Sequence, residues 1–308
     1  MIARIFFMLV ITASYARATP IDTLLAVEIG GIRQWMGFKG IDDKAPVLLF
    51  LHGGPGNSAM AYGEKFTAEL QKYFVVVMWD QRDSGQTLKL NKTDKPLSVD
   101  LMASDAVEVI KYLSKRFSQQ NIYLVGHSWG GFLALMVAQK NPELLSVCIA
   151  VSPMINQIES ERLSLEWMRS YASKTKNEEA LADLAKVNVP FQSVEQLYFD
   201  RKWTSRFAGN GPPSKSFVLK WGETWFDLWS QACQINLFDT APEMRCPVYL
   251  FIGRKDRQTH FRVAEQYFSI LKAQKKDLFW FAESGHNLNL TESAKFQQTV
   301  ISILKSEN

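Results

Sequence analysis

The segment Gly126-His127-Ser128-Trp129-Gly130 constrains the fold of this chain more than any other. It matches the pattern G-x-S-x-G, with an apolar run at 122–125 before it and a helical pattern from residue 132 after it. Glycines on both sides of a serine are typical of a tight strand-to-helix turn, because a side chain there would clash with neighbouring strands. Such a turn puts Ser128 at a helix N-terminus, where the dipole favours developing negative charge. An ordinary glycine-rich turn with a capping serine is the alternative.

Short apolar runs alternate with helical patterns along most of the chain. The runs lie at 47–51, 74–79, 122–125, 145–151, 248–252 and 278–281. Strands that are apolar throughout are expected in a parallel sheet covered on both faces. The alternation therefore predicts an α/β fold with a mostly parallel, doubly wound sheet. Gly30-Gly31 additionally predicts a hairpin within 22–38.

Residues 153–240 interrupt this alternation. They are rich in tryptophan and charged residues and mostly helical in pattern. The interval is far longer than one crossover connection needs. We therefore expect a helical cap inserted between two parts of the core, 19–152 and 241–308. Ordinary crossover helices are the alternative.

The first residues, 1–18, have the pattern of a cleavable export signal. Arg4 precedes a short apolar stretch, and Ala16-Arg17-Ala18 fits the small-x-small rule for cleavage after Ala18. The apolar stretch is too short to span a bilayer, and no long apolar run follows, so we expect no transmembrane span. We expect an exported protein, periplasmic or secreted; an uncleaved anchor or a first helix of the fold is the alternative.

Charge and cysteine content narrow the classes of partner. The formal net charge is +4, with no basic stripe, which disfavours nucleic acid as a partner.

Three cysteines leave at least one thiol unpaired, and Cys233 with Cys246 is the candidate disulfide. No cysteine pair has a metal-binding spacing. We expect neither a metal nor a cofactor, and make no prediction of oligomeric state.

A serine nucleophile needs a general base, and the chain has only four histidines. His127 adjoins the serine, and its side chain is expected to point away from it. His286 follows the last apolar run, in Glu283-Ser284-Gly285-His286. Parallel topology puts that loop at the same sheet edge as the Ser128 turn. We therefore predict His286 as the base.

The base in turn needs a carboxylate that orients it. Asp256 follows the run 248–252, where the chain order Ser, Asp, His requires an acid. We predict Asp256 for this role; helix capping is its alternative role. Glu283 and Asp239 are the competing acids.

The segment His52-Gly53-Gly54-Pro55-Gly56 follows the run 47–51. Its glycines let backbone N–H groups face a pocket, so we predict an oxyanion hole made by the amide of Gly54, or of Gly53, and that of Trp129. A phosphate loop is excluded because no Gly-Lys-Ser/Thr follows.

Together these motifs resemble the α/β-hydrolase family, and within it the proline iminopeptidase branch. The resemblance rests on residues 52–56, on Asp80-Gln81-Arg82 and on Ser128-Trp129-Gly130, and spans the chain after the leader. It implies a serine hydrolase that releases an N-terminal residue, proline first, from a small or short-peptide substrate. It also implies that Asp80 and Arg82 brace the glycine loop, although by type they are equally a surface ion pair.

The chain departs from that branch at the elbow and beside it. The branch has glycine where Asp83 stands, and its elbow reads Gly-Gly-Ser-Trp-Gly-Ser rather than Gly-His-Ser-Trp-Gly-Gly. Its cap carries glutamates that hold the substrate amine, one of them directly after a tryptophan. Here Trp229 is followed by serine, with Glu223 and Asp227 close by as substitutes.

These departures keep two other functions open. One is a small-molecule carboxylesterase or lactonase of the same fold, and the other is a catalytically silent binding protein. Epoxide and haloalkane hydrolysis are disfavoured, since those members of the family use an aspartate at the position of Ser128.

Overall fold

The computed structural model describes residues 18–91 and 95–307, so the predicted leader lies outside the described residues except for Ala18. An eight-stranded sheet with the order β1-β2-β4-β3-β5-β6-β8-β10 forms the centre. Its strands are β1 Ile21–Ile29, β2 Ile32–Gly40, β3 Val47–Leu51, β4 Val75–Asp80, β5 Ile122–His127, β6 Leu145–Val151, β8 Val248–Gly253 and β10 Lys276–Phe281. Strand β2 pairs antiparallel with β1 and β4, and the other neighbours are parallel. The predicted mostly parallel α/β sheet is confirmed.

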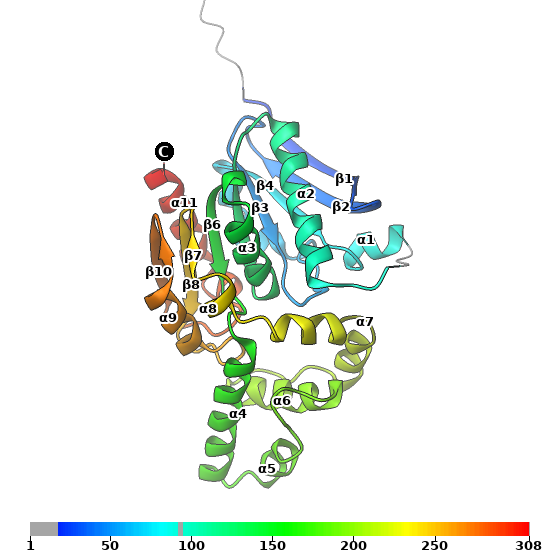
Figure 1. Ribbon diagram of the computed structural model, residues 1–308, viewed down its shortest axis with the longest axis vertical. Helices are drawn as coiled ribbons and strands as arrows, with labels where there is room; N and C mark the ends of the chain where they lie inside the picture. The colour runs from blue at the N-terminus through cyan, green and yellow to red at the C-terminus, as the bar shows by residue number, and fades with distance from the viewer. Residues whose placement is uncertain (1–17, 92–94, 308) are drawn as a thin grey trace, which may run out of the picture.

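Helices cover both faces of the sheet (Figure 1), which explains why its central strands are apolar throughout. Leu49 of β3 packs into one core layer and its neighbour Leu48 into the other. The first layer is closed by α2 Val99–Phe117, α3 Trp129–Lys140 and α9 Phe261–Ile270, and the second by η1 Gly63–Phe66, η2 Leu70–Lys72, α10 Leu288–Thr291 and α11 Ser293–Glu307.

Short elements complete the core. They are α1 Gly85–Leu90, η3 Pro142–Leu144, α8 Leu237–Thr240, and the two-residue strands β7 Glu243–Met244 and β9 Lys272–Ala273.

The predicted hairpin joins β1 to β2 through Gly30 and Gly31, whose φ angles are 58° and 74°. Positive φ at both positions is the geometry of a type I′ turn, which glycine adopts without strain.

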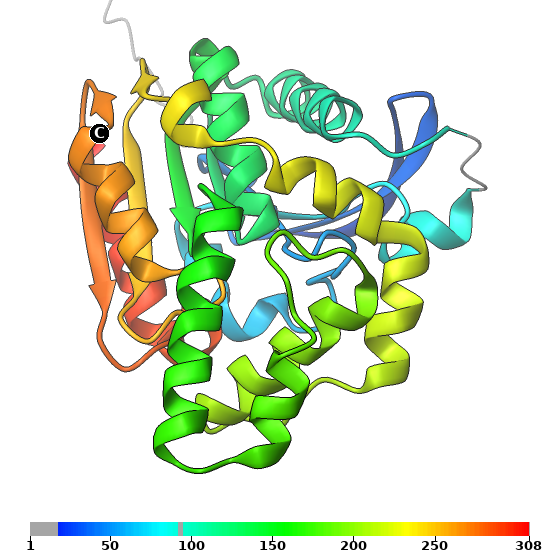
Figure 2. The ribbon, with the colours of Figure 1, turned by 60° about the horizontal axis from the view of Figure 1, so that its bottom comes forward.

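After β6 a series of helices lies within the interval where the sequence predicts a cap, and its first four members extend away from the sheet (Figure 1). They are α4 Gln157–Lys174, α5 Glu178–Leu184, α6 Val194–Phe207 and α7 Lys215–Cys233, and we call them the cap helices. Each begins at a polar residue whose side chain accepts a backbone N–H of the first turn: Asn156, Asn177, Ser193 and Ser214. Figure 2 shows them grouped beside one edge of the sheet.

All three cysteines are buried free thiols, so the candidate disulfide between Cys233 and Cys246 is not formed. Cys233 ends α7 in the cap, whereas Cys246 lies just before β8. Among residues 18–91 and 95–307, no helix is both long and apolar enough to cross a membrane.

Candidate active site

The turn after β5 holds Ser128 in a strained backbone conformation. Its φ is 56° and its ψ is −115°, a combination that side chains rarely adopt. A Cβ on Gly126 would lie 2.0 Å from the Gly130 oxygen, and one on Gly130 would lie 2.1 Å from the Leu51 oxygen. Only glycine fits at either position, which accounts physically for the G-x-S-x-G spacing.

Loops after β8 and β10 bring His286 and Asp256 together. Nδ1 of His286 lies 3.0 Å from Oδ2 of Asp256. Because a carboxylate only accepts hydrogen bonds, Nδ1 carries the proton and Nε2 is left as a base. The His286 side chain is 13% exposed and that of Asp256 is fully buried.

Hydrogen bonds keep Asp256 ionised. Oδ1 accepts the backbone N–H groups of Gln258 and Thr259 at 2.9 and 3.1 Å, and Oδ2 accepts the Thr259 hydroxyl at 2.9 Å. Burial raises the pKa of Asp256, but the interaction with His286 and these bonds outweigh it and hold that pKa below its usual value. Sequence reasoning missed Thr259; a threonine three residues after the acid was the available signal.

The competing acids bind elsewhere. Oδ2 of Asp239, within α8, accepts from the amide of Asn236 at 2.7 Å. Glu283 forms an exposed ion pair with Lys255 at 2.8 Å.

The glycine loop 52–56 packs directly on the Ser128 turn. A Cβ on Gly53 would lie 3.3 Å from Cβ of Ser128. On the cap side, a Cβ on Gly56 would collide with the Trp225 ring at 2.3 Å, and Trp221 donates its indole N–H to the Pro55 oxygen at 2.8 Å. The loop therefore lies between the turn and α7, with Gly54 at a φ of 116°.

Gln81 is the residue of Asp80-Gln81-Arg82 that braces this loop. Its side-chain amide donates to the His52 backbone oxygen and accepts the Trp129 indole N–H, both at 3.0 Å. It thus joins the glycine loop to the helix that follows Ser128. Sequence reasoning passed over Gln81 because an amide side chain carries no charge signal.

Arg82 does not brace the glycine loop, and it is not a surface ion pair with Asp80. Both side chains are buried. Arg82 binds Asp105 of α2 at 2.9 and 3.0 Å and the Gly30 oxygen at 2.9 Å, so it holds the hairpin against α2. Asp80 accepts from Ser58, just after the loop, and from the backbone N–H of Gln86.

A cavity of about 310 Å³ lies between the glycine loop and the cap helices. Among the described residues, Arg201 is the one charged residue in its wall, which is lined by Gly54, Asn57, Leu197, Arg201, Ser205, Gly211, Pro213, Phe217, Val218, Trp221, Trp229 and Gln258. No carboxylate belongs to this set.

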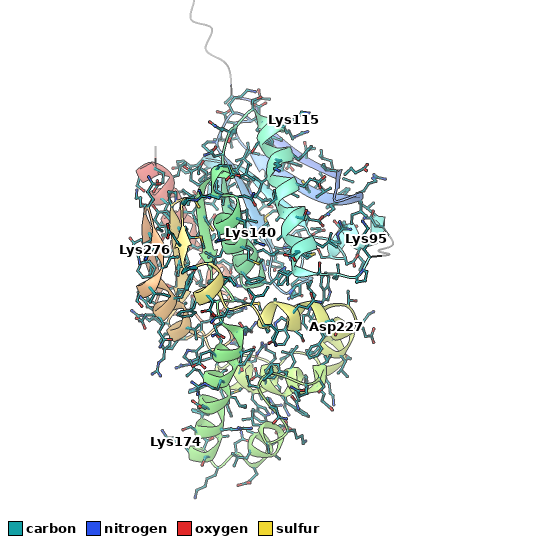
Figure 3. All side chains as sticks on the ribbon, viewed as in Figure 1. Lys95, Lys115, Lys140, Lys174, Asp227 and Lys276 are labelled. Carbon is teal, nitrogen blue, oxygen red and sulfur yellow. The ribbon has the colours of Figure 1, made fainter. Side chains whose placement is uncertain are left out.

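Glu223 and Asp227 are exposed and do not line the cavity. Each precedes a buried tryptophan of α7 by two positions, Trp225 and Trp229 respectively, and two positions turn a helix by about 200°. The acids therefore face solvent when the tryptophans face the core, and Figure 3 shows Asp227 on the outer side of α7. Neither of the two predicted substrate-binding acids therefore lines this cavity, and their role at the substrate stays a prediction.

Buried acids of the cap lie elsewhere, around Arg201. Its guanidinium binds both carboxylate oxygens of Glu161, one of them at 2.9 Å, and Oδ1 of Asp200. Gln157 links this cluster to the core, since its amide donates to Glu161 and to the backbone oxygen of Gln258. The sequence offered no signal for a cluster assembled from α4 and α6.

Burial and the nearby charge of Glu161 raise the pKa of Asp200 to about 7. Oδ2 of Asp200 is buried and finds no hydrogen-bond partner among the described residues. This carboxyl group is therefore largely protonated below neutral pH.

Comparisons with known proteins agree with this architecture. A family model described as alpha/beta hydrolase fold matches residues 46–293. The probable aminopeptidase YbaC of Bacillus subtilis is 28% identical, with 89% of this chain and 93% of that protein covered.

Solved structures show the same fold at lower identity. A proline iminopeptidase-related protein from Thermus thermophilus is 22% identical, with a TM-score of 0.62 over 92% of this chain and 98% of that one. An esterase from Exiguobacterium antarcticum is 21% identical, with a TM-score of 0.59 over 92% and 100%.

Proposed function

Since this chain belongs to the alpha/beta hydrolase family, we propose that it is a serine hydrolase in which Ser128, His286 and Asp256 form the catalytic triad. The observation that carries the proposal is the pairing of a strained serine turn with a histidine–carboxylate contact of 3.0 Å. That pairing uses the chain order Ser, Asp, His that the fold requires.

The chemistry is acyl transfer to water. Ser128 Oγ attacks the substrate carbonyl carbon while Nε2 of His286 takes the hydroxyl proton. Backbone N–H groups of Trp129 and Gly54 stabilise the oxyanion. His286 then gives its proton to the leaving group, the carbon–leaving-group bond breaks, and an ester on Ser128 remains. Water, deprotonated by His286, hydrolyses that ester and restores the serine.

We further propose release of an N-terminal residue from a short peptide, proline being the first choice. The aminopeptidase-named relative spans nearly the whole chain, which supports this reading. The cap also supports it, because the cavity of about 310 Å³ between the glycine loop and the cap helices has a volume that suits a small substrate rather than a polypeptide. The leader pattern of residues 1–18 supports an exported enzyme.

One observation favours a second candidate, hydrolysis of a small neutral ester or lactone. A substrate ammonium in a partly desolvated pocket needs a carboxylate beside it. The described residues of the cavity wall contribute none, and the buried Glu161 and Asp200 already bind Arg201. A panel of amino-acid naphthylamides and short-chain p-nitrophenyl esters separates the two candidates.

The triad itself is tested by fluorophosphonate labelling and by the variants Ser128→Ala and His286→Ala. We expect the wild type to be labelled at Ser128, and each variant to lose turnover by several orders of magnitude. Circular dichroism should show both variants folded. Near-normal activity in Ser128→Ala would refute the triad, and an unlabelled, inactive wild type would favour the binding-protein alternative.

A further inference from the structure

His127 directly precedes Ser128, yet its side chain contacts the loop of the base. Its Nε2 lies 2.9 Å from the backbone oxygen of His286, and the two ring centroids are 5.0 Å apart. On its other side, a Cβ on Gly53 would lie 3.1 Å from Nδ1 of His127. One imidazole therefore contacts both loops that flank the serine.

The hydrogen bond defines the protonation state of this ring. A carbonyl oxygen only accepts, so Nε2 of His127 carries the proton and donates it to His286. Burial and the neighbouring His286 lower the pKa of His127 to about 4. The ring is therefore neutral at neutral pH, and its one N–H is committed to the loop of the base.

The loop has a second attachment, to the residues that follow β8. The backbone N–H of Lys255 donates to the Ser284 oxygen at 3.0 Å, and Asp256 binds the His286 ring. Between these contacts lies Gly285, where an added Cβ would meet its nearest atom only at 3.6 Å. Glycine permits a wider range of backbone angles than other residues, so the contact from His127 limits that freedom on the serine side.

We propose that His127 is a positioning residue for the general base. Its N–H fixes the backbone of His286 and so limits where the His286 ring can lie relative to the Ser128 turn. The proposal rests on the triad proposed above and adds a residue to it. The resembling branch has glycine at this position, so the contact belongs to this chain's own sequence.

Three substitutions separate positioning from packing. His127→Gln places an amide N–H near the position of Nε2, whereas His127→Asn places it nearer Nδ1, too short to reach the carbonyl. His127→Phe keeps a ring and removes the donor. We expect the Asn and Phe variants to lower kcat by about 10–100-fold with KM changed less than about twofold, because base geometry and not binding is lost. The Gln variant should restore most of kcat.

The measurements are kcat and KM on the best substrate of the panel, with the rate of fluorophosphonate labelling and melting curves. Val125→Ala is the matched control: it removes buried atoms from the same strand without touching the site, so it should lower the melting temperature and leave kcat unchanged.

Wild-type kcat in His127→Phe, or equal impairment of the Gln and Asn variants, would overturn the positioning role. If the Phe variant does not fold, the comparison of Gln with Asn decides alone. Failure of the triad has a different signature, since Ser128→Ala would then stay active whatever the His127 variants do.

Discussion

Replacing Asp200 by asparagine should make the free energy of unfolding depend less on pH as the pH rises through 7. The structure motivates this change because Asp200 is fully buried beside Arg201 and Glu161, and its pKa is raised to about 7. Asparagine resembles the protonated acid: its oxygen can still accept from Arg201, and its NH2 group replaces the unpartnered Oδ2.

The sign follows from proton binding in the two states. The usual aspartate pKa is 3.8, so between that value and about 7 the folded protein holds a proton that the unfolded chain has released. Stability contributed by Asp200 is therefore present at low pH and is lost as the pH rises through 7. At about 1.4 kcal/mol per pH unit, the loss between about pH 5 and about pH 8 is about 2.5 kcal/mol.

The assay is urea unfolding of the wild type and Asp200→Asn at both pH values. The wild type should lose about 2.5 kcal/mol more than the variant on going from the lower to the higher pH. Asp183→Asn is the control. Asp183 is an ion-paired cap acid whose pKa is lowered, despite burial, by Lys202 and Trp203, so its loss should cost the same at both pH values. Parallel pH dependence of the wild type and Asp200→Asn would refute the reasoning.

Two further predictions concern the cap surface and the leader. Glu223→Gln and Asp227→Asn should change kcat/KM by less than about twofold on both free-amine and acetate substrates, because exposed charges contribute little; a selective loss on the free-amine substrate would return the ammonium site to α7. Expressed with its own leader in a Gram-negative host, the protein should be recovered from the periplasm beginning at Thr19, as N-terminal sequencing would show; a retained Met1 would contradict cleavage.

Local sterics and the periodicity of apolar residues were enough to predict the serine turn, the buried strands and the sheet edge where the site lies. At Gly126 and Gly130 a backbone oxygen lies so close to the Cα that a Cβ would collide with it. Only glycine fits there, so the spacing of the two glycines predicts the turn without knowledge of the remaining structure. Runs that are apolar at every position predict strands buried on both faces, because successive side chains point to opposite faces. In a parallel sheet the carboxyl ends of the strands share one edge, so the sequence predicts that Asp256 and His286 lie close together there. In the structure, Nδ1 of His286 lies 3.0 Å from Oδ2 of Asp256.

The tertiary structure decided what depends on contacts between distant segments. The sequence shows Glu223 and Asp227 near the tryptophans of α7, but only packing against the core decides which face of that helix lies in solvent. Arg201 meets Glu161 from another helix, Gln81 joins two loops, and His127 reaches the loop of His286. Each of these contacts joins residues far apart in the chain, and a side chain's partner across such a distance is determined by how the elements pack rather than by its neighbours in sequence.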